Sequence, residues 1–225
     1  MSDTQEQFAK IYKEHIWGGT SKSGPGSDPE VLQAYTKLLV DLIKSKKVRS
    51  VVDAGCGDWA LSRTLDWTGV DYTGIDIVPD LIKRLNVTYG STSVRFACLD
   101  VVSDQLPIAD LCVIKDVLQH LSIDSVRAVL AKFENTFKFA LITNDITHTE
   151  QGGWRSMWRT EEYEANRDIP NGGYRPLRLT EQPFNLNANR LITIPLQFKR
   201  GVFGHPGTVR ETKEVLLWES SQCHS

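Results

Sequence analysis

The sequence predicts an α/β protein with a mostly parallel sheet and helices on both faces. Apolar runs of strand length alternate with segments of helical periodicity, and a glycine turn follows the first of these runs. Near the C-terminus, apolar stretches at 191–198 and 215–219 flank a loop with Gly, Pro and His, which predicts a closing antiparallel hairpin. A chain of 225 residues, 40% of them hydrophobic, is long enough for one domain with a full core.

The N-terminal part predicts two helices separated by a loop. Phe8, Ile11 and Tyr12 have helical spacing within residues 4–15. After a stretch rich in Gly and Ser, Asp28-Pro29 is a favourable helix start, because proline is well tolerated in the first turn. Apolar residues then recur every three or four positions as far as Ile43, which predicts a helix that packs on the core.

The middle of the chain predicts the parallel part of the sheet. Repeated strand–helix units imply right-handed crossovers, with helices covering both faces. The apolar residues Val126, Val129, Leu130, Phe133 and Phe137 form the buried face of the helix before the fifth strand. The expected strands are 49–54, 71–76, 93–98, 110–115 and 138–144.

Composition argues against several classes of partner. A net charge of -2 provides no basic face, so neither a nucleic acid nor a membrane surface is expected. No apolar run reaches the ~20 residues of a membrane span. The polar, acidic N-terminus is wrong for a signal peptide, and the four cysteines show no paired spacing. These features predict a cytoplasmic protein in a reducing compartment.

The glycine turn carries the strongest functional signal. The first expected strand ends in Asp53-Ala54-Gly55-Cys56-Gly57, and the second ends in Asp76, 23 residues after Asp53. Two glycines let the backbone turn sharply and approach a ligand without a Cβ in the way. An acid at the end of the next strand lies where a ribose diol is bound in open α/β sheets. This combination predicts an adenosine-type cofactor.

The residues after the turn favour a cationic ligand. A dinucleotide needs a helix N-terminus that can close on its pyrophosphate. Here Asp58 and Trp59 place a negative charge and a bulky ring at that position, and Asp53 can accept a hydrogen bond from an ammonium. S-adenosylmethionine, with an ammonium and a sulfonium, fits these residues better than NAD does.

These motifs resemble those of the class I S-adenosylmethionine-dependent methyltransferases. The first motif of that family reads D/E-x-G-x-G, the second ends in an acid such as Asp76, and Asp100 matches the acid that faces the adenine. Strand 109–116 matches the motif under the methionine moiety. The resemblance covers residues 48–145 and implies a Rossmann-like, mostly parallel seven-stranded sheet with an antiparallel C-terminal hairpin. The predicted cofactor-binding residues are Trp17, Asp53, Gly55, Gly57, Asp58, Asp76, Ile77, Asp100, Val101 and Lys115.

Candidate catalytic residues follow the fourth and fifth strands. Asp116 and His120 are four residues apart and would share one face of a helix, where the acid could orient the imidazole as a base for a hydroxyl. The alternative is that His120 packs as a hydrogen-bonded core residue between leucines. His148, just beyond the fifth strand, is the rival base.

A metal site is the weaker alternative. Catechol-type methyltransferases hold Mg²⁺ with a carboxylate after strand four and an acid–amide pair after strand five. Asp116, Asn144 and Asp145 occupy such positions, but the pair is in the reverse order and the surrounding motif is absent. A chain turn is the favoured explanation of Asn144-Asp145, so Mg²⁺ is kept only as the alternative cofactor beside S-adenosylmethionine.

The polar segment 146–189 is the predicted acceptor-binding insert. Its Trp154, Arg155, Trp158 and Arg159 are spaced so that one helical turn would present both pairs, and such side chains bind sugar faces and anions. A solvated lid with docked tryptophans is the alternative. The expected divisions of the single domain, 1–225, are a helical cap (1–47), a cofactor-binding core (48–145), this insert, and the hairpin (190–225).

The leading hypothesis is therefore O-methylation of a sugar, glycan or other small hydroxyl-bearing acceptor. The position after strand four reads Lys115-Asp116-Val117-Leu118, not the Asn/Asp-Pro-Pro-aromatic motif of enzymes that methylate planar amines. The N-terminal stretch 16–27 also resembles a subgroup from surface-glycan and small-molecule pathways. The alternatives are an NAD(P)-dependent oxidoreductase and a non-catalytic cofactor-binding partner subunit.

Overall fold

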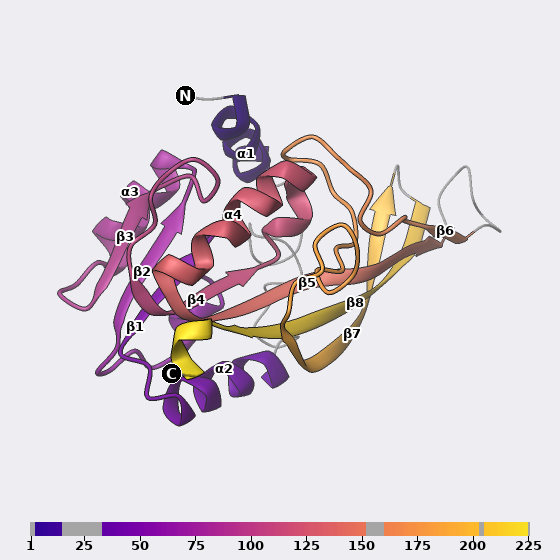
Figure 1. Cartoon of the computed structure of the whole chain (residues 1–225). Helices are drawn as coiled ribbons and strands as arrows, with labels where there is room; N and C mark the ends of the chain where they lie inside the picture. The colour runs from indigo at the N-terminus through magenta and orange to yellow at the C-terminus, as the bar shows by residue number, and fades with distance from the viewer. Residues whose placement is uncertain (1–2, 15–32, 152–159, 203–204, 225) are drawn as a thin grey trace.

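A computed structural model describes residues 3–14, 33–151, 160–202 and 205–224 of the chain (Figure 1). Its helices are α1 (Asp3–Glu14), α2 (Gln33–Ser45), α3 (Pro79–Tyr89) and α4 (Ile123–Thr136), with short 3-10 turns η2 (Ser62–Thr64), η3 (Leu118–His120) and η4 (Ser221–His224). The strands are β1 (Ser50–Ala54), β2 (Asp71–Asp76), β3 (Val94–Cys98), β4 (Ala109–Lys115), β5 (Phe137–Gln151), β6 (Thr160–Glu162), β7 (Asn189–Val202) and β8 (His205–Glu219). No helix among these residues is long and apolar enough to cross a membrane.

One mixed sheet runs through the molecule in the order β3-β2-β1-β4-β5-β8-β7. The neighbours from β3 to β5 are parallel, and β8 pairs antiparallel with both β5 and β7. The chain reverses its direction of strand addition beside β1, so the carboxyl ends of β1, β2 and β4 open onto one crevice. The predicted fold, a mostly parallel sheet closed by an antiparallel hairpin, is confirmed.

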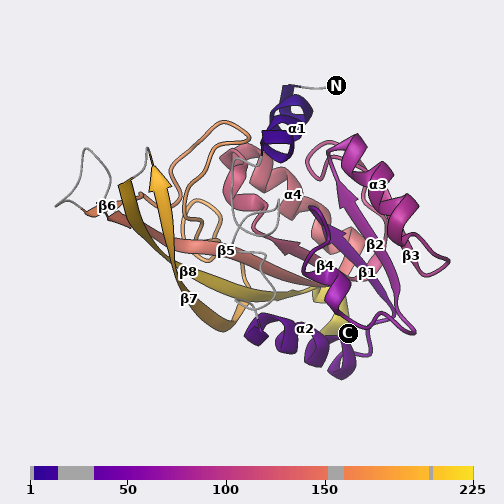
Figure 2. The same ribbon diagram turned by 180° about the vertical axis from the view of Figure 1, so that it is seen from behind.

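Alternate residues of the central strands face opposite layers. Val51 and Leu111 pack in a cluster with α2 and α3, whereas Val52 and Cys112 pack in a second cluster with α4. The strands are buried on both faces, as expected for the parallel part of a sheet. Figures 1 and 2 show α4 on the opposite side of the sheet from α2 and α3.

Helix α4 illustrates how the local sequence sets an element. Its N-cap residue Ser122 accepts a hydrogen bond from the backbone N–H of Ser125, which satisfies one donor of the first turn. Val126, Val129 and Phe133 then recur at helical spacing and are buried on the sheet. The expected buried face of this helix is confirmed at these positions.

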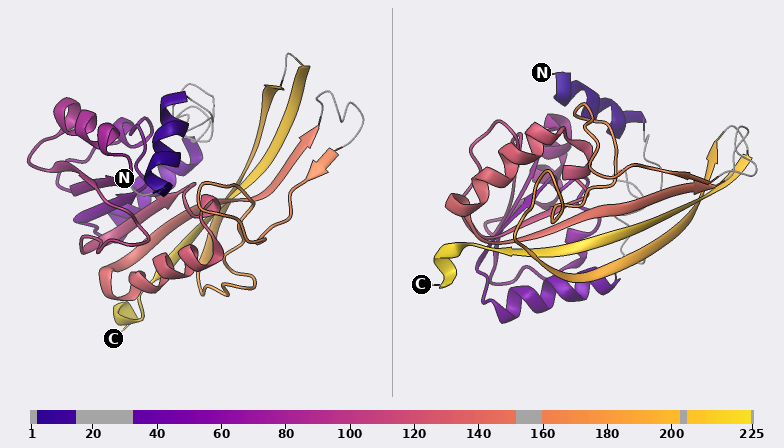
Figure 3. Two further views of the ribbon diagram at one scale, coloured as in Figure 1. Left: turned by 90° about the horizontal axis from the view of Figure 1, so that it is seen from above. Right: turned by 45° about the vertical axis from the view of Figure 1, so that its right-hand side comes forward.

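The antiparallel strands are much longer than the sequence predicts. Strand β5 continues past 144 as far as Gln151, and β7 and β8 extend over 189–202 and 205–219. The polar residues of 146–151 do not read as a strand, but their backbones pair with β8 through Gln151↔Thr208, beyond an irregularity between Asp145 and Thr147. Figure 3 shows these strand ends extending beyond the part of the sheet that the helices cover.

The prediction of seven strands is also corrected. The short β6 pairs with β5 through Glu150↔Glu161, so the described residues form an eight-stranded sheet. Part of the predicted insert, 146–189, is therefore sheet, and its described residues 163–188 form loops. The expected first helix is α1, whereas the helix start at Asp28-Pro29 lies outside the described residues.

Candidate active site

The turn after β1 requires its glycines. Gly55 and Gly57 have φ angles of 77° and 57°, in the left-handed region that side chains disfavour. A Cβ on Gly55 would lie 2.3 Å from Cγ2 of Val117. The turn is fixed against β2, because the backbone N–H groups of Gly55 and Cys56 both donate to the carbonyl of Ile75, at 2.8 and 3.0 Å.

Asp76 is held at the end of β2 by the same turn. Its Oδ2 accepts from the backbone N–H of Gly57 at 3.1 Å, and its Oδ1 accepts from that of Val78 at 3.1 Å. Burial raises the pKa of Asp76 to about 6, although these hydrogen bonds oppose the shift. The carboxylate is thus rigidly placed at the crevice, and its remaining lone pairs can accept from a ligand's hydroxyl groups.

Asp53 lies inside the end of β1. Its Oδ2 accepts from the hydroxyl of Ser62 at 2.7 Å and from the hydroxyl of Tyr72. Burial raises its pKa, and these two donors limit the rise. Ser62 comes from η2, so this carboxylate also ties the turn after β1 to the strand.

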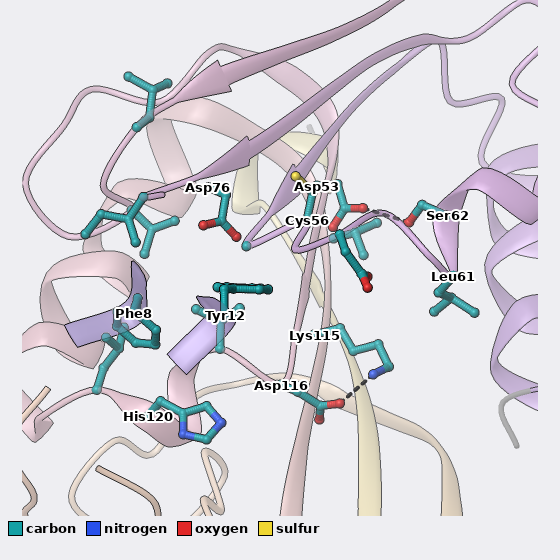
Figure 4. Close-up of a pocket in the computed structure, with 18 of the residues that line it drawn as sticks. Phe8, Tyr12, Asp53, Cys56, Leu61, Ser62, Asp76, Lys115, Asp116 and His120 are labelled. Atoms are coloured by element: carbon teal, nitrogen blue, oxygen red, sulfur yellow. Dashed lines mark hydrogen bonds and ion pairs between the residues drawn. The ribbon is translucent and has the colours of Figure 1, made fainter. Parts of the chain in front are cut away.

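An open cavity of about 990 Å³ lies over the carboxyl ends of β1, β2 and β4 (Figure 4). Most of the predicted cofactor-binding residues line it: Asp53, Gly55, Asp58, Asp76, Ile77, Asp100, Val101 and Lys115. Gly57 contributes through its bond to Asp76, while Trp17 lies outside the described residues. The structure thus places these residues around one cavity, where their binding role remains a prediction.

The cavity also has walls that sequence reasoning missed. Phe8 and Tyr12 reach it from α1, and Tyr35 from α2 (Figure 4 shows the first two). Leu99 and Leu121 add apolar surface. The helical spacing of Phe8 and Tyr12 predicted a buried face, but nothing local indicates that this face covers a cavity and not the core.

Asp116 combines a left-handed backbone with two ion pairs. Its φ is 58°, in the left-handed region, and its carboxylate pairs with Lys115 and, at 2.8 Å, with Nζ of Lys213 from β8. Burial opposes ionisation, but the two ammonium groups outweigh it and lower the pKa of Asp116 to about 2. Asp116 is therefore an ion-paired carboxylate and is poorly suited to be a base.

His120 lines the cavity, but not through the helix that the sequence predicts. Residues 118–120 form the 3-10 turn η3, and Nδ1 of His120 bonds at 2.8 Å to the carbonyl oxygen of Gly173, not to Asp116. A carbonyl only accepts, so Nδ1 carries the proton. Burial lowers the pKa of His120, which keeps the ring neutral and places its basic lone pair on Nε2.

His148 lies on the antiparallel extension of β5 and does not line the cavity. Its Nδ1 is 2.8 Å from Glu211 and its Nε2 is 3.1 Å from Glu150. Burial lowers the pKa of His148, but the two carboxylates outweigh that effect and raise it. His148 thus lies outside the cavity lining with both ring nitrogens beside carboxylates, which does not support its assignment as a rival base.

The alternative magnesium ligands do not form a metal site. Lys213 lies between Asp116 and Asp145, at 2.8 and 2.7 Å, so an ammonium already occupies the position between the two carboxylates. Asn144 precedes Asp145 in β5, and successive strand residues point to opposite faces. No cluster of His, Cys, Asp and Glu suited to a metal occurs among the described residues. These side chains do not fit a magnesium site.

Four predicted acceptor-binding residues, Trp154, Arg155, Trp158 and Arg159, lie outside the described residues. The rest of that segment nevertheless reaches the cavity edge through Gly173, which bonds to His120. Lys213, Gly173 and Arg175 are the residues at this edge that sequence reasoning missed. They come from distant parts of the chain, and no local pattern marks them.

Comparison with known proteins agrees with this architecture. Residues 52–138 match a family model described as a methyltransferase domain. A malonyl-[acyl-carrier protein] O-methyltransferase from Acetivibrio thermocellus is 31% identical over 81 residues, which are 34% of this chain and 29% of that protein. The chain thus matches less than a third of that relative's length.

Two solved structures share the fold over nearly the whole chain. The N-methyltransferase NodS from Bradyrhizobium japonicum, solved with S-adenosylhomocysteine, is 14% identical, with 95% of this chain and 99% of that chain covered and a TM-score of 0.55. The N-terminal domain of EvdMO1, solved in the presence of S-adenosylhomocysteine and D-fucose, is 13% identical, with 98% of each chain covered and a TM-score of 0.55. Residues 52–138 thus match a methyltransferase-domain family, and the chain shares its fold with these S-adenosylhomocysteine-binding methyltransferase structures.

Proposed function

We propose that this protein is a methyltransferase that binds S-adenosylmethionine in the cavity over β1, β2 and β4. The observation that carries the proposal is the position of Asp76, which the glycine turn and Val78 hold rigidly at the end of β2. A carboxylate at this point suits the two hydroxyl groups of a ribose. Asp53, Asp58 and Asp100 make the lining acidic, which favours a ligand carrying an ammonium and a sulfonium.

The same lining argues against the two alternative functions. A pyrophosphate would meet Asp53, Asp58 and Asp76, and among the described lining residues the one Lys or Arg is Lys115, which pairs with Asp116, so an NAD(P) oxidoreductase is disfavoured. A non-catalytic cofactor-binding subunit has no use for a neutral, oriented histidine beside the cofactor cavity. His120 therefore favours an enzyme.

The acceptor end of the cavity is suited to a hydroxyl. Bound S-adenosylmethionine supplies a methyl group on a positively charged sulfur, which leaves with the bonding electron pair as a neutral thioether. Nε2 of His120 takes the proton of the acceptor hydroxyl as the oxygen–methyl bond forms. Phe8 and Tyr12 from α1 lie over this space, where they would exclude water and limit the positions of the acceptor.

A sugar or glycan is the acceptor class we favour. The support is the Trp and Arg content of segment 152–159, together with the EvdMO1 domain, which was solved with D-fucose. NodS is an N-methyltransferase and the Acetivibrio relative is an O-methyltransferase of a malonyl-carrier protein, so an amine and a carboxylate are the competing acceptors. A carboxylate has no proton to lose, and this difference separates it from a hydroxyl.

The experiment is a mass-spectrometric screen for methyl transfer over sugars, nucleotide sugars, phenols, amines and carboxylic acids. Each reaction is run with S-adenosylmethionine, with and without a chelator. We expect a product 14 mass units heavier from a hydroxyl acceptor, unchanged by the chelator. Trp154→Ala and Arg159→Ala should then weaken acceptor binding while S-adenosylhomocysteine binds normally. Methylation confined to amines or carboxylates would overturn the acceptor assignment. Unchanged acceptor kinetics in both variants would mean that segment 152–159 does not bind the acceptor.

A further inference from the structure

The loop that carries His120 is joined to a segment 53 residues later in the chain. The backbone N–H of Gly172 donates to the carbonyl of His120 at 2.7 Å, and Nδ1 of His120 donates to the carbonyl of Gly173 at 2.8 Å. The backbone N–H of Arg175 donates to the carbonyl of Gln119 at 3.2 Å. Backbone and side chain of the histidine are thus both bound by the same short segment.

The side chain of Arg175 adds two further bonds to this loop. Its Nη1 donates to the carbonyl of Leu118 at 3.1 Å and its Nη2 donates to that of Leu121 at 2.9 Å. These two carbonyls lie on either side of His120, at the start and just past the end of η3. The guanidinium fork therefore sets the spacing of the turn from which the imidazole projects.

Arg175 has an unusual environment for a charged residue. It is fully buried, at 0% exposure, and its guanidinium donates hydrogen bonds to backbone carbonyls. Its Nε has no hydrogen-bond partner among the described atoms. Burying a guanidinium in this way is unfavourable, and an apolar side chain of similar size would serve packing alone. The buried arginine therefore indicates that the position of the loop carrying His120 matters to the protein.

Gly172 connects the same segment to the helix over the cavity. Its φ is 86°, and a Cβ at this position would lie 2.3 Å from the side-chain amide of Gln7 on α1. The segment thus packs between α1, which lies over the cavity, and η3, which lines it. The left-handed φ favours a glycine here, independently of the bonds to His120.

We propose that Arg175 and Gly173 are positioning residues that hold His120 as the Nδ1–H tautomer and direct Nε2 at the acceptor. This inference rests on the proposed function, in which Nε2 takes the acceptor's proton. A ring that donated through Nε2 would present no base to the hydroxyl. The carbonyl of Gly173 excludes that tautomer, because it needs a donor at Nδ1, and Arg175 keeps the turn where this bond forms.

The test combines a spectroscopic readout with kinetics on the full-length protein. Nitrogen-15 NMR of histidine-labelled protein reports the tautomer, with the His120 signals assigned through His120→Asn. In the wild-type protein we expect the proton on Nδ1. Arg175→Met should raise the share of the other tautomer and lower kcat by about 10- to 100-fold, with KM for S-adenosylmethionine within about twofold, because Arg175 does not line the cavity.

Arg178→Met is the matched control. Nε of Arg178 also donates to a backbone carbonyl, that of Ile146 at 3.1 Å, but this arginine makes no contact with η3. It should leave the tautomer and kcat unchanged. If Arg175→Met does not fold, Arg175→Gln, which keeps a donor without the charge, takes its place with the same expectations.

The results distinguish the positioning role of Arg175 from the role of His120 as the base. An unchanged tautomer and unchanged kcat in the Arg175 variant would overturn the positioning role. An altered tautomer with unaltered kcat would also overturn it, because the orientation would then not matter to the reaction. If the Arg175 variant alters the tautomer but His120→Asn has full activity, the assignment of His120 as the base fails instead.

Discussion

Nζ of Lys213 on β8 lies 2.7 Å from Oδ1 of Asp145 on β5. The same ammonium lies 2.8 Å from Oδ1 of Asp116 at the end of β4. Lys213 and Asp145 are both buried, and Asp116 is largely so. An ammonium from the antiparallel hairpin thus bridges two carboxylates, of which Asp116 lines the cavity, and joins the hairpin to the parallel sheet.

Lys213→Met should destabilise the fold strongly. The substitution removes the cation between two carboxylates. Among the described side chains, the buried Asp145 then keeps only uncharged partners such as Gln119. Breaking one side of such a buried pair reduces the free energy of unfolding by about 3–5 kcal/mol. Urea unfolding followed by circular dichroism measures the loss.

Lys37→Met is the matched control for that variant. Lys37 pairs with Asp41 at 2.7 Å on the surface of α2, with side chains 79% and 57% exposed. An exposed pair of this kind contributes little to stability, because solvent screens the two charges. Equal, small losses in the two variants would contradict the role assigned to Lys213.

Binding of S-adenosylhomocysteine should weaken in mildly acid solution. The pKa of Asp76 is raised to about 6, so its carboxylate becomes protonated below that pH and loses an acceptor for the ribose hydroxyls. Affinity should be constant above pH 7 and about tenfold lower at pH 5, one unit below the pKa. Isothermal titration calorimetry across this range gives the profile. Asp76→Asn should bind weakly at every pH, and a profile of wild-type shape in that variant would show that another group titrates.

His120→Asn should lower kcat by about 10²–10⁴-fold, the usual contribution of a general base. Asparagine retains an N–H that can donate to the carbonyl of Gly173 but has no basic nitrogen. Its affinity for S-adenosylhomocysteine should stay within about twofold of the wild-type value, since Asp76 and the glycine turn remain intact. Steady-state kinetics with calorimetry separates the two effects. His148→Ala provides the comparison, and a kcat loss there alone would return the role of base to His148.

The sequence predicts the parts of this site whose residues are close together in the chain, but not those that are far apart. The turn of Gly55 and Gly57 and the acid at Asp76 lie within two strand–helix units, and their types and spacing indicate the cavity directly. Lys213 is 97 residues from Asp116, and Gly173 is 53 residues from His120. Those contacts depend on how β8 and the 163–188 loops fold back, which no local pattern specifies.

The boundaries of the antiparallel strands were missed for a related reason. Residues 146–151 alternate too little between polar and apolar to indicate a strand, and pairing with β8 stabilises them. The helical relation expected between Asp116 and His120 was wrong because Asp116 takes a left-handed backbone and only a 3-10 turn follows.

His148 should make the stability of the fold depend on pH. Burial opposes the charged ring, but Glu211 and Glu150 outweigh this effect and raise the pKa in the folded state. A raised folded-state pKa contributes stability that is complete below the unfolded value of about 6.5 and is lost as the pH rises through the folded value. The hydroxyl of Tyr174 also lies 3.1 Å from Nδ1 of His148, and this tyrosine remains unchanged in the comparison.

The measurement is urea unfolding of the wild-type protein and His148→Gln at several pH values between 5.5 and 9. The difference in free energy of unfolding between the two should be largest at the acid end and shrink as the pH rises. A difference that grows with pH would mean that His148 is held neutral, contrary to the assigned ion pairs.

Calorimetric binding at pH 7.5 tests the central claim, that the cavity over β1, β2 and β4 binds S-adenosylmethionine. Wild-type protein should bind S-adenosylhomocysteine, and Asp76→Ala should bind it at least about tenfold more weakly, since a hydrogen bond to a charged group contributes about 1.5–3 kcal/mol. NADH should not bind measurably to either protein. Binding of NADH with no binding of S-adenosylhomocysteine, or equal affinity of the wild type and Asp76→Ala for S-adenosylhomocysteine, would contradict the claim.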